Sequence, residues 1–408
     1  MDSRRISRLN YRFGISFFLI AGIIGVIIRW HFLNPIKGFP YKNWLHAHSH
    51  ITFLGWVFLG IIAVLCYHFK DIPSFPRKTI RNLTWLIVIA NVGMLISFPI
   101  EGYGPVSIFF SAVHMVLGIY TYILFSRIFK GIKSFGISMI KSSFLFMILS
   151  GLGPIALGPI ITLGYKTTYW YEFAVYFYLH FQYNGWFTLA IVGIMIHYLN
   201  PRGMNSKWIW IINLSVLLTY FLSTLGVRPA LWIYIIGGIG GLMQIIGFAY
   251  VTWHILKNYQ KFFESSRFST NILLGIALIA FEIKLLLQFF SSIPSIADWI
   301  MHSRNLVIAY LHFVLLGFVT SFILGWWNKI YVSKDSREFR LGTILFFIGL
   351  TGTEITLFLY GIKVFPSFVL PYQLLLVFSI ILTLSILLYF VNSFQQSKER
   401  EYLIKHDE

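Results

Sequence analysis

The chain has 408 residues, of which 57% are hydrophobic and only 11% are charged, and its mean hydropathy is +0.75. A soluble domain carries about 25% charged residues, so this composition excludes soluble enzymes, disordered proteins and secreted disulfide scaffolds. The net charge of +18 does not indicate a nucleic-acid partner, because the basic residues form short clusters between apolar runs rather than one patch.

Twelve apolar segments follow one another along the chain, each close to the ~20 residues that cross a bilayer. They predict an all-α, polytopic membrane protein that forms a single transmembrane domain over residues 1–408, with the lipid bilayer as its surroundings. The predicted spans are 13–30, 44–68, 82–101, 106–126, 142–163, 172–198, 208–225, 230–255, 270–291, 305–327, 341–362 and 368–392.

Lys and Arg are distributed unevenly among the loops between these spans. Of the 32 basic residues, 24 lie on the side of the N-terminus and seven lie on the other side, and Lys284 lies within a span. Because positively charged loops are retained in the cytoplasm, both termini are predicted to be cytoplasmic. The protein is expected in a bacterial inner membrane.

The only cysteine, Cys66, lies in an apolar run, and the sequence contains no Cys-x-x-Cys-His motif. The chain therefore has no disulfide framework and no covalently attached c-type haem. Any haem would be held by coordination alone.

Four of the predicted spans contain a histidine well inside them: His50, His114, His180 and His312. Ionisable side chains in spans are costly and usually face the bundle interior or a site. In the second, sixth and tenth spans, glycine follows the histidine five residues later and an aromatic residue comes next. This recurrence at every fourth span predicts a three-fold internal repeat with the histidines at similar depth. The alternative is that each histidine simply hydrogen-bonds to a neighbouring helix.

Imidazole is a common axial ligand of haem iron. Two histidines from different helices would give a six-coordinate, low-spin iron suited to electron transfer, so the pattern predicts at least one non-covalently bound haem b. Arg228, Arg304 and Lys363 lie on the predicted outer side. They are candidate partners for the haem propionates, or else ordinary loop charges.

These residues resemble the catalytic subunit of the haem-copper oxidase superfamily, most of all its nitric oxide reductase branch, over nearly the whole chain. The segment His180-Phe-Gln-Tyr-Asn-Gly-Trp is similar to the reductases' His-Leu-Trp-Val-Glu-Gly-x-Trp. Tyr310-Leu-His312-Phe-Val-Leu-Leu-Gly is similar to His-x-His-x-x-x-x-Gly. Leu225-Gly-Val-Arg-Pro-Ala-Leu-Trp-Ile occupies the place of Gly-x-His-His-x-x-x-Trp-Ile. The resemblance implies that His50 and His312 are the two axial ligands of one low-spin haem.

The chain departs from the family at the reactive site. Tyr310 stands where a haem-binding histidine is expected, Arg228 and Pro229 replace the histidine pair of the second metal, and Asn184 replaces a glutamate ligand. Only His180 is left of that metal set, and one histidine does not hold a metal ion. His180 is then expected to hydrogen-bond with Asn184, one turn away. A complete dinuclear centre, and the oxygen reduction that depends on it, is not expected.

Several assignments stay open at this point. Tyr310 either binds a second haem, as tyrosine does in catalase, or packs against neighbouring helices. His46, His48 and His50 are all candidate ligands on the second span. Glu282 and Lys284 are two residues apart in the ninth span, so they do not pair on one helix face.

The resemblance implies a protein that transfers electrons, or that binds or reduces a diatomic gas, NO or O2, at an altered second site. The sequence shows no c-type or copper-binding donor domain, so the electrons would come from a partner subunit, a cytochrome or a quinol. The alternative is a non-redox transporter, sensor or assembly factor that keeps the fold without the chemistry.

Overall fold

The computed structural model describes residues 3–263, 267–301, 303–331, 336–365 and 369–406. Within these ranges, every regular element is an α-, π- or 3-10 helix. Eleven of the described helices are long and apolar enough to cross a membrane. The predicted class, an all-helical protein of the multi-pass membrane type, agrees with this architecture.

The eleven helices match eleven of the twelve predicted spans, and the sixth, 172–198, is the exception. That segment is helical from Tyr169 to Leu199, which is long enough to cross a bilayer. Its polar residues, among them His180 and Asn184, lower its hydropathy. The count of twelve spans therefore stays a prediction.

The chain divides into two compact units. Unit 1 contains residues 1–117, 267–275 and 320–408, and unit 2 contains residues 118–266 and 276–319. Three elements contribute residues to both units: α5 (Pro105–Ile128), α13 (Phe268–Phe290) and η5 (Phe313–Thr320). The single domain expected from the sequence stays a prediction.

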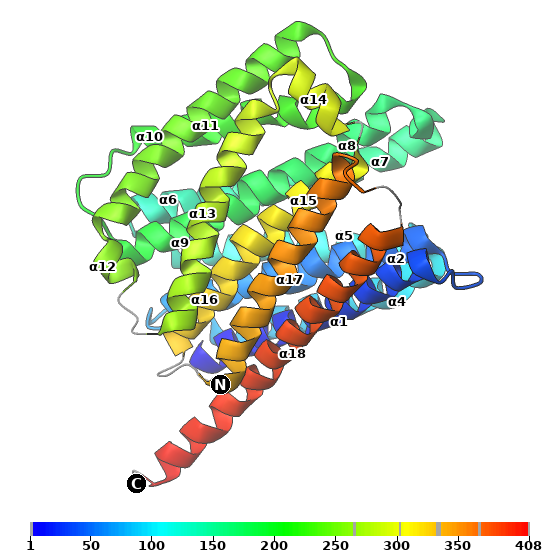
Figure 1. The fold of residues 1–408 in the computed structure, drawn as a ribbon. Helices are drawn as coiled ribbons and strands as arrows, with labels where there is room; N and C mark the ends of the chain where they lie inside the picture. Colours follow the sequence, from blue (N-terminus) through cyan, green and yellow to red (C-terminus); the bar gives the residue numbers. More distant parts are fainter. Residues whose placement is uncertain (1–2, 264–266, 302, 332–335, 366–368, 407–408) are drawn as a thin grey trace. The chain divides into compact units, whose positions relative to one another are not determined.

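Unit 1 combines helices from both ends of the chain (Figure 1). Besides parts of the shared elements it contains α1 (Ser3–Leu33), α2 (Tyr41–His50), η1 (Ile51–Val57), α3 (Phe58–His68), α4 (Arg77–Glu101), α16 (Ser321–Tyr331), α17 (Arg337–Gly361) and α18 (Val369–His406). Helix α1 packs against α3 and α18, and α17 packs along α18. A methyl group on Gly349 would lie 2.7 Å from Leu382 Cγ, so small residues allow these two helices to approach closely.

Unit 2 holds the middle of the chain (Figure 1). It contains α6 (Phe135–Ser150), α7 (Leu152–Thr162), η2 (Tyr165–Thr167), α8 (Tyr169–His180), η3 (Phe181–Phe187), α9 (Thr188–Leu199), α10 (Lys207–Leu218), η4 (Thr219–Val227), α11 (Leu231–Lys257), α12 (Tyr259–Phe262), α14 (Pro294–Met301) and α15 (Arg304–His312). Helix α6 packs against α9, and α10 packs against α11. The last turns of the α10 segment tighten into the 3-10 helix η4, which ends at Val227. The next residue, Arg228, is in the left-handed conformation, φ 49°.

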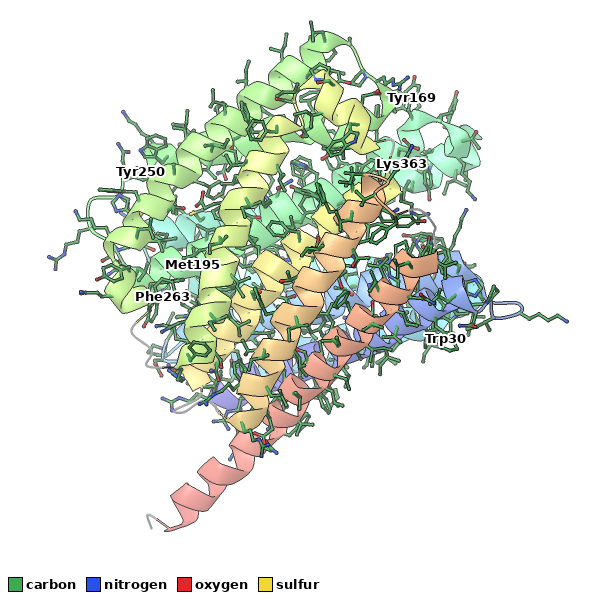
Figure 2. The ribbon with its side chains drawn as sticks, in the orientation of Figure 1. Trp30, Tyr169, Met195, Tyr250, Phe263 and Lys363 are labelled. Atoms are coloured by element: carbon green, nitrogen blue, oxygen red, sulfur yellow. The ribbon has the colours of Figure 1, made fainter. Side chains whose placement is uncertain are left out.

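Both units expose large apolar side chains. Ile100 of unit 1 is 77% exposed and Trp210 of unit 2 is 78% exposed. A soluble protein rarely exposes so much apolar surface, whereas lipid covers it in a bilayer. Figure 2 shows Trp30 near the end of α1 and Tyr169 at the start of α8, positions typical of the aromatic belt at a membrane surface.

Candidate functional site

Each of the three repeated histidines ends an α-helix, and a π-helix begins at the next residue. His50 ends the ten residues of α2, His180 the twelve of α8, and His312 the nine of α15. The π-helices that follow are η1, η3 and η5. Because π-helices are rare and frequently occur at functional sites, the sequence pattern is accompanied by an unusual local structure. The motif spacing predicts similar depth along each helix, but not this change of helix type.

The glycine of each motif lies within the π-helix and packs against the span that precedes it. A methyl group on Gly55 would lie 2.8 Å from Cβ of Phe17, and one on Gly185 would lie 2.5 Å from Cβ of Phe146. The same addition to Gly317 would meet Ala280 at 3.3 Å. The close approach that glycine permits is therefore occupied by a neighbouring helix in all three cases.

A π-helix releases backbone carbonyls from the regular α-helical ladder, and side chains satisfy them here. In η1, the carbonyl of Leu54 accepts hydrogen bonds from His114 Nε2 at 3.2 Å and from Asn91 Nδ2 at 3.3 Å. In η3, the carbonyl of Tyr183 accepts one from the Thr188 hydroxyl at 2.6 Å. The span histidine His114 thus supports the π-helix rather than facing a ligand.

His50 has the hydrogen-bond arrangement of a metal-ligating imidazole. Its Nδ1–H donates to the carbonyl of His46 at 2.9 Å, which leaves the lone pair on Nε2. The ring packs against Phe98 at 4.3 Å and Tyr103 at 5.8 Å between centroids. The side chain is only partly buried although it lies inside an apolar span. A haem iron at Nε2 fits these observations, because backbone bonding of the other nitrogen fixes the ring and its tautomer.

His48 shares one property of His50. Its Nδ1 lies 2.9 Å from the carbonyl of Ala21 on α1, and its ring packs against Gly25 of the same helix. Nε2 of His48 therefore also carries the lone pair when Nδ1 donates. His46 contacts Tyr103 at 4.5 Å between ring centroids. The choice among His46, His48 and His50 therefore stays open, with His50 deepest along the helix.

His180 is fully buried and uses both ring nitrogens. Nε2 donates to the carbonyl of Val216 at 2.9 Å, while Nδ1 lies 3.0 Å from the Ser223 hydroxyl and 3.1 Å from Asn184 Nδ2. The expected hydrogen bond between His180 and Asn184 is therefore present. A metal could bind His180 only by displacing these partners, so the geometry does not favour the predicted weak metal role.

His312 and Tyr310 both lie in α15, and both side chains are partly buried. The Tyr310 ring packs edge-on against Tyr183 at 6.5 Å between centroids, which is the packing alternative for this tyrosine. His50 belongs to unit 1 and His312 to unit 2. The pairing of these two histidines on one haem stays a prediction that follows from the family resemblance.

The three outer-side basic residues differ in their surroundings. Arg228 forms a 2.7 Å ion pair with Asp298, so its guanidinium already binds a carboxylate within the chain. Arg304, at the start of α15, is exposed. Lys363 is also exposed, directly after α17, and is labelled in Figure 2. Arg304 and Lys363 are thus the more available candidates for an external anion or a propionate.

Among the described residues, no group of three or more His, Cys, Asp or Glu side chains is arranged to hold a metal ion. A haem requires only one or two axial side chains, so this observation does not bear on haem. In comparisons with known proteins, no family model and no curated protein matches the chain. The functional argument therefore depends on the residues themselves.

Proposed function

We propose that the chain is a haem-binding integral membrane protein of the oxidase and nitric oxide reductase type. In this proposal it has twelve spans built as a three-fold repeat, and His50 and His312 are the axial ligands of one haem b. The observation that carries it is the bond from His50 Nδ1 to the carbonyl of His46, which leaves the imidazole lone pair on Nε2. The π-helix behind each motif histidine adds support.

The chain's own residues would have defined tasks. His50 would hold the iron, while Phe98 and Tyr103 restrict the rotation of its ring and keep water from one side. Exposed Arg304 and Lys363 would neutralise propionates, because guanidinium and ammonium groups donate to carboxylates. The haem, when bound, supplies one-electron redox chemistry or binding of a diatomic gas.

Electrons would come from a donor subunit, a cytochrome or a quinol, with the protein in a bacterial inner membrane and both termini in the cytoplasm. The 24 to seven division of basic residues supports this orientation. A second haem at Tyr310 is not part of the proposal because this ring packs against Tyr183. A second metal is not part of it because His180 is committed to hydrogen bonds.

The hydrogen bonds at both ring nitrogens of His180 also favour a second candidate function. A transporter, sensor or assembly factor could keep the fold while its former reactive site serves only packing. In that case the histidines of the second and tenth spans would bind no haem, and the purified protein would be colourless.

The test compares single alanine variants of the full chain, purified in detergent after expression with a haem supply. His50→Ala and His312→Ala should each abolish the low-spin bis-histidine signal in the visible and electron paramagnetic resonance spectra. His114→Ala is the matched control and should retain the signal, since Nε2 of His114, the nitrogen that stays available in His50, donates to the Leu54 carbonyl. Full retention in both ligand variants would overturn the assignment.

A further inference from the structure

Lys284 is fully buried in α13, and its surroundings do not satisfy its ammonium group. The side chain is 0% exposed. Among the described residues, its one hydrogen bond is a long 3.5 Å contact to Oε1 of Gln288, one turn along the same helix. An ammonium group has three donors, so most of its capacity is unused. An ionisable residue of this kind inside a membrane-spanning helix usually marks a functional site.

The described residues of unit 2 provide no carboxylate for this charge. Glu282 is two residues away on another helix face and bonds the Thr252 hydroxyl at 2.6 Å. Asp298 is paired with Arg228, and Glu172 lies in the first turn of α8, close to Tyr176. The protonated form of Lys284 therefore has no acidic side chain to neutralise it in the described part of this unit.

Two further polar groups surround this position. Lys284 is close enough to His180 to act on it electrostatically. Asn184, which donates to His180, is 2% exposed, and its Oδ1 has no hydrogen-bond partner among the described residues. His180 thus links Asn184 of η3 to the neighbourhood of Lys284 in the interior of unit 2.

Gln244 of α11 lies at a similar height along the helices of unit 2 as Lys284, as the contacts of its neighbours on α11 indicate. Helix α11 contacts α13 where Gly241 packs against Phe289 and where Phe248 packs against Phe281. Gln244 lies between Gly241 and Phe248 in the sequence, and Lys284 lies between Phe281 and Phe289. The two residues are therefore at a similar height along the packed helices. On the α10 side, Gly240 meets Thr219 and Gly247 meets Ile212. Gln244 is then level with Val216, the residue whose carbonyl accepts from His180.

The amide of Gln244 is not satisfied either. The side chain is 1% exposed, and within the described part of the chain neither its Nε2 nor its Oε1 has a hydrogen-bond partner. Buried polar atoms without partners are uncommon in native proteins, and they frequently indicate a bound ion or water. We call the group formed by His180, Asn184, Gln244, Lys284 and Gln288 the polar layer.

We propose that the polar layer binds a small monovalent inorganic anion, of the size of chloride or nitrite, beside Nζ of Lys284. The ammonium donors and the Gln244 Nε2 amide bind the anion, and water retained with it donates to Asn184 Oδ1 and Gln244 Oε1. Water alone would fill the hydrogen bonds but would leave a protonated Lys284 without a counter-charge, whereas an anion stabilises the protonated form. A cation would be repelled by Lys284. This inference does not depend on haem binding.

The test is the thermal unfolding midpoint of the full-length protein in detergent, as sodium bromide, chloride or nitrite replaces sodium gluconate at constant ionic strength. The wild-type midpoint should rise in a saturable way with each small anion. Lys284→Met should lose this rise. The matched control is Lys166→Met, which changes an exposed lysine of the same unit and should behave as wild type. No saturable rise in the wild type, or an unchanged rise in Lys284→Met, would overturn the proposal.

A second measurement does not depend on whether the methionine variant folds. Crystals of the wild-type protein grown with bromide should show an anomalous scattering peak within hydrogen-bond distance of Lys284 Nζ. Ordered water at this position with no bromide peak would show that the layer is only hydrated, and would refute the anion site. Lys284→Arg keeps the charge and should keep the anion dependence of the midpoint.

Discussion

The helix from Tyr41 to His68 in unit 1 and the helix from Tyr169 to Leu199 in unit 2 have the same local plan. In both, a histidine ends an α-helix, a π-helix follows, glycine packs against the preceding span and a fully buried tryptophan comes next. The histidines nevertheless differ in chemistry. His50 bonds the backbone through Nδ1 alone, whereas His180 engages both nitrogens. The shared backbone thus positions an imidazole, and its hydrogen-bond partners decide whether the imidazole can bind a metal.

The largest expected effect separates these two histidines by haem content. His180→Ala should retain the haem-to-protein ratio of the wild type, because its ring has no nitrogen to offer iron. His50→Ala should reduce that ratio at least about tenfold, the effect of losing about 1.4 kcal/mol or more of binding free energy. The ratio is measured by pyridine haemochrome assay on purified protein. Equal loss in both variants would remove the distinction between the two sites.

The three motif glycines test how well each helix tolerates an added methyl group at this position. Gly185→Ala should destabilise most, by about 1–3 kcal/mol, because its new methyl group would overlap Phe146. Gly55→Ala should cost less, since the contact with Phe17 is 2.8 Å. Gly317→Ala, with 3.3 Å to Ala280, should be close to neutral because alanine favours helix. The free energy of unfolding in denaturant gives the order, and a reversed order would contradict this packing.

Stability should also depend on the hydrogen bonds of His180. Removing the ring takes the acceptor from the Asn184 amide and leaves the Val216 carbonyl only the Thr219 hydroxyl at 3.3 Å, so His180→Ala should cost about 1–3 kcal/mol of unfolding free energy. The control is His254→Ala, at a partly exposed position, which should change it by less than about 0.5 kcal/mol. If the two variants unfold alike, the hydrogen bonds of His180 contribute nothing measurable.

The smallest expected change in the free energy of unfolding concerns the Leu54 carbonyl, which the π-helix η1 releases from the α-helical hydrogen bonds. His114→Phe removes one of the two donors to the Leu54 carbonyl, and Asn91 Nδ2 still reaches it. The expected loss is about 0.5–1.5 kcal/mol, the net value of one hydrogen bond. The double variant with Asn91→Leu should lose more than the sum of the single changes, because the carbonyl is then unpaired. Strict additivity in a double-mutant cycle would contradict this account.

Hydropathy alone predicts the helical class and eleven of the spans, because apolar runs of this length have few other stable forms. The sixth predicted span is less certain because it carries the buried polar residues of unit 2. The histidine–glycine spacing indicates which helices share the same local structure. The hydrogen bond between Asn184 and His180 is predictable because the two residues are one helical turn apart. The π-helices were not predictable, since a change of helix register leaves no periodicity that a short motif reveals.

The sequence also does not reveal which charged side chains form ion pairs. Arg228 and Asp298 are 70 residues apart, and only the fold brings them together at 2.7 Å. From the sequence alone, Arg228 is a candidate propionate partner or a loop charge, because nothing there reveals its carboxylate. The sequence likewise does not reveal that Lys284 lies near His180, 104 residues earlier in the chain.

The most direct measurement for the central claim is the visible absorption spectrum of the purified full-length protein, oxidised and then reduced with dithionite. The proposed ligation of haem b by His50 and His312 predicts a coloured protein with at least about one haem per chain and a sharp, low-spin α-band on reduction. A colourless, folded preparation, obtained after expression with sufficient haem, would contradict the account.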